Sequence, residues 1–124
     1  MKRILILDDD PDLLEVLKEA LETNGYETKT KSCSADLFQM VDEFKPDLLL
    51  LDFLLTNENG GEICVLLKGN KTTKHLPIVL LSGYCSLEEM HVIYGCDSYL
   101  AKPFDLGKLL KIIENLIARD TKLG

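Results

Sequence analysis

Residues Lys45–Gly61 read KPDLLLLDFLLTNENGG, and this stretch decides the fold. Four consecutive leucines run directly into Asp52, and a polar loop that ends in two glycines follows. A short apolar run between turn residues is typical of a strand buried on both faces, as in the middle of a parallel sheet. Asp52 would then lie at the carboxyl edge of the sheet, which is where open α/β sheets bind their ligands.

Four further segments have the composition of short strands, and apolar residues recur at helical spacing between them. The predicted strands, besides the leucine run, are Arg3–Asp8, Tyr26–Lys31, Ile78–Leu81 and Ser98–Ala101. The predicted helices run from Pro11 to about Gly25, from Ser34 to Phe44, over Glu62–Gly69 and Ser86–Tyr94, and from about Asp105 to Arg119. We expect Asp10 to cap the first helix and Ser34 to cap the second, because their side-chain oxygens accept hydrogen bonds from free amides at helix starts.

Strands that alternate with helices predict an α/β fold with right-handed crossovers. We expect a flavodoxin-like, doubly wound, five-stranded parallel sheet in the order 2-1-3-4-5, covered by five helices. The 124 residues fit one domain, 1–124, in which residues 120–124 form a tail or the start of a linker.

The overall composition argues against several classes of protein. The net charge is −7 and no Lys/Arg-rich block occurs, so we expect no direct binding to nucleic acid. No run approaches the ~20 apolar residues of a membrane helix, and the short apolar run before Asp8 is too brief for a secretory signal. The cysteines form no CxxC pair, which argues against a zinc site or a disulfide framework. We therefore predict a cytoplasmic protein with reduced thiols.

Polar residues end most of the predicted strands. Asp8 and Asp9 follow the first strand, Asp52 ends the third, Ser82 ends the fourth, and Lys102 follows the fifth. In the order 2-1-3-4-5 the first and third strands are neighbours, so the three aspartates meet at one edge of the sheet. Two carboxylates about 4 Å apart repel by roughly 4 kcal/mol at an effective dielectric constant near 20, which favours a bound divalent cation.

Magnesium suits such a site because it accepts carboxylate and carbonyl oxygens, keeps several waters and takes a phosphate oxygen as a further ligand. Lys102 would supply a positive charge, and Ser82 a hydroxyl donor, to an anion beside the metal. The residues predict phosphoryl chemistry with a carboxylate as the nucleophile. We also expect Glu58, in the loop after Asp52, to pair with Lys102 when phosphate is absent.

Four segments resemble, in this order and across the whole chain, the receiver domains of two-component response regulators. They are ILILDDDP (residues 4–11), LLLLDFLLTNENGGEI (48–63), PIVLLSGY (77–84) and GCDSYLAKPF (95–104). The resemblance implies that Asp52 accepts a phosphoryl group from a phosphohistidine on a sensor histidine kinase or a histidine phosphotransfer protein. It also implies Mg²⁺ as the cofactor, bound directly by Asp9, Asp52 and the backbone carbonyl of Leu54, with Asp8 acting largely through water.

The resemblance extends to residues that respond to phosphorylation. Tyr99 holds the position of an aromatic residue that turns inward as the hydroxyl residue, here Ser82, moves to the phosphoryl group. Gly60 matches the glycine that ends the loop after the acceptor, and Pro103 matches a proline that is usually cis. The resemblance implies that a downstream protein effector, or a second copy of the domain, binds the surface that changes.

The chain departs from the family pattern at two positions near the site. Thr56 replaces a proline four residues after the acceptor, so we expect a looser loop, and Gly83 replaces a common alanine, which opens the backbone there. Leu54 and Tyr84 occupy positions that tune hydrolysis of the acyl phosphate in the family. Because both side chains are large enough to shield it from water, we hypothesise slow autodephosphorylation. A phosphorylated form with a half-life of seconds in buffer would contradict this.

Three other functions use the same fold or similar residues. A phosphatase of the haloacid dehalogenase type also has a strand-ending aspartate, but it needs a second aspartate two residues later, where this chain has Leu54. A flavodoxin would place its flavin phosphate against the acidic first loop, which repels it. A receiver used without phosphorylation is disfavoured by the complete set of site residues. We expect the chain to promote its own phosphorylation and dephosphorylation and to turn over no external substrate.

Overall fold

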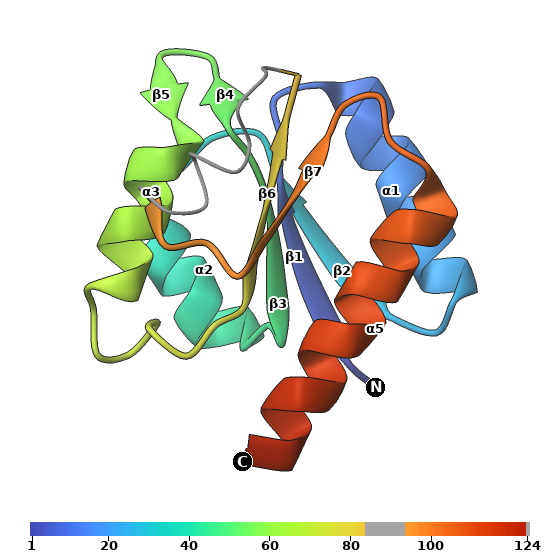
Figure 1. Cartoon of the computed structure of the whole chain (residues 1–124). Coiled ribbons are helices and arrows are strands. Elements are labelled where there is room, and N and C mark those ends of the chain that lie inside the picture. The colour runs from blue at the N-terminus through green and yellow to red at the C-terminus, as the bar shows by residue number, and fades with distance from the viewer. Residues whose placement is uncertain (84–93, 124) are drawn as a thin grey trace.

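The computed structural model describes residues 1–83 and 94–123, with side chains up to residue 119. Its centre is a parallel sheet formed by β1 (Arg3–Leu7), β2 (Glu27–Lys31), β3 (Leu48–Asp52), β6 (Ile78–Ser82) and β7 (Ser98–Ala101). The strands lie in the order β2-β1-β3-β6-β7, and every adjacent pair is parallel (Figure 1). A separate hairpin contains β4 (Leu54–Leu55) and β5 (Glu58–Asn59), so the predicted sheet order 2-1-3-4-5 is confirmed.

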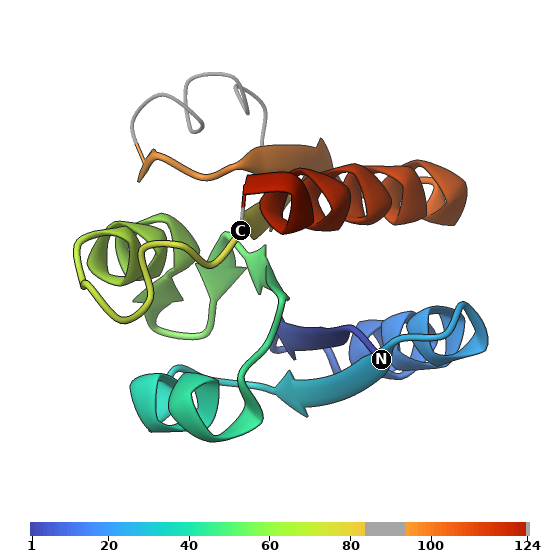
Figure 2. The same ribbon diagram turned by 90° about the horizontal axis from the view of Figure 1, so that it is seen from below.

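The described helices cover both faces of the sheet. They are α1 (Pro11–Thr23), α2 (Leu37–Phe44), α3 (Gly60–Lys68) and α5 (Leu106–Leu123). Figures 1 and 2 show α1 and α5 on one face and α2 and α3 on the other, which confirms the doubly wound arrangement. The remaining predicted helix, Ser86–Tyr94, falls on residues 84–93 outside the described part of the chain, apart from Tyr94.

The last helix differs from its predicted bounds. α5 continues to Leu123 instead of ending near Arg119, so residues 120–123 of the predicted tail are helical. Figure 1 shows the final turns of α5 projecting below the sheet. Within the described residues, no helix is both long and apolar enough to cross a membrane.

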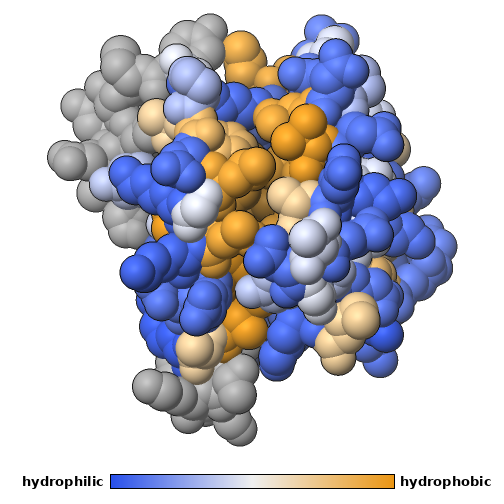
Figure 3. Space-filling view, turned by 90° about the vertical axis from the view of Figure 1, so that its right-hand side faces the viewer, coloured by the Kyte–Doolittle hydropathy of each residue, from blue (hydrophilic) through white to orange (hydrophobic). Residues whose placement is uncertain are grey.

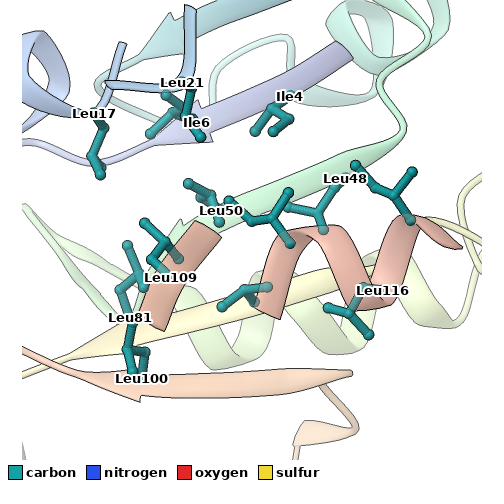
Figure 4. Packing of buried hydrophobic residues seen from close by; sticks show 13 residues of the cluster. Ile4, Ile6, Leu17, Leu21, Leu48, Leu50, Leu81, Leu100, Leu109 and Leu116 are labelled. Atoms are coloured by element: carbon teal, nitrogen blue, oxygen red, sulfur yellow. The ribbon is translucent and has the colours of Figure 1, made fainter. Parts of the chain in front are cut away.

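The leucine run of β3 connects the two halves of the core. All four of its leucines are fully buried. Leu48 and Leu50 belong to the cluster between the sheet and the α1 and α5 face, where Figure 4 shows them beside the side chains of α5. Leu49 and Leu51 belong to the cluster on the α2 and α3 face. Because side chains alternate along a strand, one uninterrupted apolar run fills both layers.

The predicted cap of the first helix is confirmed, and the predicted cap of the second is wrong. The Asp10 carboxylate accepts hydrogen bonds from two backbone amides of the first turn of α1, at 3.0 and 3.3 Å. α2 begins after Asp36, which has a left-handed backbone with φ 57° and makes no side-chain cap. A turn, in which the Ser34 carbonyl accepts from the Leu37 amide at 3.0 Å, moves the start of α2 beyond the reach of the Ser34 hydroxyl.

The polar loop after β3 is a short antiparallel hairpin, which no pattern in the sequence predicts. Thr56 and Asn57 form its turn, and Asn57 has a positive φ of 62°, a conformation that asparagine tolerates. Gly60 ends the hairpin and begins α3. A Cβ at Gly60 would collide with the backbone carbonyl of Asp52, so packing requires a glycine at this position.

Candidate functional site

The carboxyl ends of four sheet strands bring the predicted site residues together. Asp8 follows β1, Asp52 ends β3, Ser82 ends β6, and Lys102 follows β7. The aspartates and the serine are almost fully buried, with exposed fractions of 0% for Asp8, 5% for Asp52 and 1% for Ser82. Burial of a charged carboxylate is costly unless another charge compensates it, so the neighbours of these groups decide what the site can bind.

Three carboxylates form an acidic cluster at this edge of the sheet. Asp8, Asp9 and Asp52 each place an oxygen within 4.8 Å of the other two. The Nζ of Lys102 lies 2.9 Å from Asp8 Oδ2 and 3.2 Å from Asp52 Oδ1. One ammonium group balances only one of three carboxylates, so negative charge remains for a divalent cation. The hard oxygen donors fit magnesium, which is the predicted cofactor.

The pKa values of Asp52 and Lys102 reflect competition between burial and charge. Burial raises the pKa of the Asp52 carboxyl, and the charge of Asp8 raises it further. Lys102 and a hydrogen bond from the Leu54 backbone amide oppose this shift without cancelling it. Burial disfavours the charged form of Lys102, but its hydrogen bonds to the two carboxylates and their charges outweigh burial and raise its pKa. Lys102 is therefore protonated at neutral pH, and Asp52 is a more basic carboxylate than an exposed one.

Asp8 and Asp9 use their oxygens differently. Both oxygens of Asp8 have protein partners, because Oδ2 accepts from Lys102 and Oδ1 accepts from the backbone amide of Asp10 at 2.9 Å. Asp9 is only partly buried, and its Oδ2 accepts from the Thr56 hydroxyl at 2.7 Å. Asp9 thus belongs to the acidic cluster and also contacts the loop that follows β3. Because both Asp8 oxygens already have protein partners, Asp8 is better placed to contact a cation through a water molecule than directly.

The predicted pair between Glu58 and Lys102 is wrong. Glu58 lies on β5, and its Oε1 accepts from the backbone amide of Ser34 at 3.3 Å. Lys102 bonds the two buried aspartates instead. The hairpin turns Glu58 toward the connection between β2 and α2, and the buried carboxylates offer Lys102 stronger partners than a residue near the surface.

The remaining predicted residues surround the cluster. The peptide bond between Lys102 and Pro103 is cis, as the resemblance implied. Tyr99 lies on β7, is partly buried, and packs against the core cluster on the α2 and α3 face. Leu54 is 52% exposed. Tyr84, predicted to shield the acyl phosphate, lies outside the described residues.

An apolar groove borders the site on the α1 and α5 face, and the sequence alone does not reveal it. Its volume is about 490 Å³, and its lining consists of Leu13, Val16, Lys102, Pro103, Phe104 and Leu106. Figure 3 looks onto this face and shows apolar side chains gathered in a band between polar surfaces. The groove lies between α1 and the loop after β7. No local sequence pattern reports that these segments are adjacent.

Known proteins resemble this chain over nearly its whole length. The family model of the response regulator receiver domain matches residues 4–114. The chain is 35% identical over 119 residues to Response regulator MprA of Mycobacterium tuberculosis, a match that covers 94% of this chain and 51% of that protein. The chain spans about half the length of the curated relatives it matches.

Two solved structures share the fold at comparable identity. A response regulator receiver domain protein (CheY-like) from Methanospirillum hungatei has a TM-score of 0.88 and 30% identity, covering 100% of this chain and 99% of that one. The response regulator protein TrrA from Thermotoga maritima, solved in complex with Mg²⁺-BeF, has a TM-score of 0.80 and 30% identity, covering 94% and 99%.

Proposed function

The chain belongs to the response regulator receiver domain family, and from this premise we propose that Asp52 is the phosphoryl acceptor of a two-component system. The proposed donor is a phosphohistidine on a sensor histidine kinase or a histidine phosphotransfer protein. An Asp52 oxygen forms a bond to phosphorus while the bond between phosphorus and the histidine nitrogen breaks, and the imidazole leaves. The product is an acyl phosphate on Asp52.

The position of Lys102 is the observation that supports this proposal most directly. Its Nζ lies 3.2 Å from Asp52 Oδ1, so it would lie beside a phosphoryl group attached to that side chain. A compact positive charge at this place offsets the negative charge that the transferred group brings. Ser82 ends the neighbouring strand and supplies a hydroxyl to the same group.

We propose that the acidic cluster holds magnesium. Its protein ligands would be Asp9, Asp52 and the backbone carbonyl of Leu54, with Asp8 acting through a bound water. The solved complex of TrrA with Mg²⁺-BeF supports this proposal, because TrrA shares the fold at 30% identity. When bound, the ion neutralises the cluster and polarises a phosphoryl oxygen.

We propose that a partner recognises the change in charge at the site. A phosphoryl group carries about −1.5 to −2 charges at neutral pH and several acceptor oxygens. Ser82 and Lys102 would move toward these oxygens, and Tyr99 would turn inward behind them. The surface formed by β7 and the start of α5 would then bind a protein effector or a second copy of the chain. We expect this exchange to take place in the cytoplasm.

Beryllium fluoride, used as a non-covalent mimic of a phosphoryl group, tests the proposal. We expect the amide NMR resonances of Ser82, Tyr99 and Lys102 to shift when the mimic and magnesium are added together. Magnesium alone is the control that separates the effect of the cation from that of the mimic. The Asp52→Asn variant should show no additional shift with the mimic, because a neutral amide replaces the carboxylate that would bind it. Wild-type resonances that do not change beyond the effect of magnesium would contradict the proposal.

A further inference from the structure

Thr56 makes a hydrogen bond that links two loops of the site. Its hydroxyl, at the turn of the β4–β5 hairpin, donates to Asp9 Oδ2 at 2.7 Å, and the two residues are 47 positions apart in the chain. The proline found at this position in the family pattern has no hydroxyl to donate. A chain with proline at this position could not make this bond.

The hairpin that carries Thr56 is anchored at several other points. Glu58 accepts from the Ser34 amide at 3.3 Å, which ties the hairpin to the connection before α2. Asn59 caps α3 by accepting from the Gly61 amide at 2.7 Å. The Gly60 amide donates to the Phe53 carbonyl at 2.6 Å, which closes the base of the hairpin. These bonds fix the position from which the Thr56 hydroxyl reaches Asp9.

Asp9 needs such a contact because it is the least buried member of the acidic cluster. Asp8 and Asp52 are buried, whereas Asp9 is only partly so, and burial restricts the rotation of a side chain. The Thr56 hydroxyl bonds Asp9 Oδ2, and an Asp9 oxygen lies within 4.8 Å of a carboxylate oxygen of Asp8 and of Asp52, so this bond restricts the rotation of a carboxylate that belongs to the cluster. The same bond links Asp9 to the hairpin whose first strand, β4, carries the Leu54 carbonyl.

We propose that Thr56 is a positioning residue for the divalent cation, because it holds Asp9 in the orientation that binds the ion. This inference rests on the magnesium site proposed above. Hydrogen bonds to the carboxylates that ligate a metal commonly contribute about 10–100-fold to its affinity. Since Thr56 is exposed to water, we expect an effect near the lower end of that range.

Magnesium titrations followed by amide NMR resonances test the inference. The first titration, on the wild-type chain, establishes that magnesium binds and saturates. Thr56→Val keeps the shape of the side chain and removes the hydroxyl, and we expect its dissociation constant for magnesium to rise about ten-fold. Thr56→Ser keeps the hydroxyl, so its dissociation constant should stay within about two-fold of the wild-type value.

Thr28→Val is the matched control. Thr28 on β2 also donates its hydroxyl to a carboxylate, Glu22 Oε1, at 3.1 Å, but neither residue belongs to the cluster. Its loss should leave magnesium affinity unchanged. Thermal unfolding of all variants without metal should show that Thr56→Val is folded, and Thr56→Ala provides a second removal of the hydroxyl.

The possible results separate this inference from the proposed function. If the wild-type chain shows no saturable magnesium binding, both the cation site and the role of Thr56 are overturned. If it binds magnesium but Thr56→Val binds equally well or more tightly, only the role of Thr56 is overturned. Thr56→Ser binding as weakly as Thr56→Val would also overturn it, because the loss would then follow side-chain shape instead of the hydroxyl.

Discussion

Asp52 occupies a position in the folded protein that disfavours its own charge. Burial and the neighbouring Asp8 raise its pKa, and Lys102 only partly offsets them. A carboxylate with a raised pKa is a better nucleophile, but the folded state bears the cost of keeping it charged and buried. At the scale of single residues, reactivity and stability therefore oppose each other at Asp52.

Replacing Asp52 by asparagine should raise the free energy of unfolding of the metal-free protein at neutral pH, because burial and the charge of Asp8 disfavour the Asp52 carboxylate in the folded state. The folded-state pKa of Asp52 lies above its ordinary value of 3.8, so the folded protein holds this proton more tightly than the unfolded chain does. The free energy of unfolding of the wild type then falls as pH rises from about 3.8 through the folded-state pKa. The advantage of Asp52→Asn should be complete above this range and should shrink as pH falls toward 3.8.

Urea unfolding in the presence of a chelator, at a series of pH values, measures this effect. The chelator matters because a bound cation would favour the charged carboxylate and reverse the difference. An Asp52→Asn protein that is less stable than the wild type at neutral pH without metal would show that Lys102 outweighs burial and Asp8.

At the scale of elements, local sequence patterns predict some features and fail at others for a physical reason. β3 was predictable because its leucines form a long apolar run between turn residues, and the Asp10 cap was predictable because its contacts are local. The β4–β5 hairpin was not, since strands of two residues have no periodicity to detect. Its form depends on the positive φ of Asn57 and on contacts to distant loops. The hydrogen bonds of Thr56 to Asp9 and of Glu58 to Ser34 depend on the shape of the hairpin. The sequence therefore predicted neither bond.

The base of the hairpin provides a sharp test of packing. Gly60→Ala would push a Cβ into the backbone carbonyl of Asp52, so we expect it to destabilise the protein by about 2 kcal/mol or more. Gly83→Ala is the matched control, because a Cβ there meets no atom of the described residues within 4 Å, and its effect should stay within about 0.5 kcal/mol. Urea unfolding measures the free energy of unfolding of both variants. A loss for Gly60→Ala as small as that for Gly83→Ala would show that a shift of the hairpin relieves the close approach at Gly60.

At the scale of the whole molecule, the order of the strands creates the site. Lys102 and Asp8 are 94 positions apart in the chain, yet they lie 2.9 Å apart because β1, β3, β6 and β7 end at the same edge. The sequence predicted this meeting from the strand-ending residues and the assumed order. The sequence wrongly paired Lys102 with Glu58 instead of with Asp8 and Asp52, because such contacts depend on side-chain orientation. The apolar groove beside the site escaped prediction because no local sequence pattern reports that α1 and the loop after β7 are adjacent.

The central claim is that Asp52 accepts a phosphoryl group with the help of magnesium. Intact mass spectrometry after incubation with acetyl phosphate, with and without magnesium, tests it most directly on the wild type and on Asp52→Asn. We expect the wild type to gain the mass of one phosphoryl group only with magnesium, and the variant to gain none. A wild-type chain that binds magnesium but gains no phosphoryl group, or an Asp52→Asn chain that gains one, would contradict the claim.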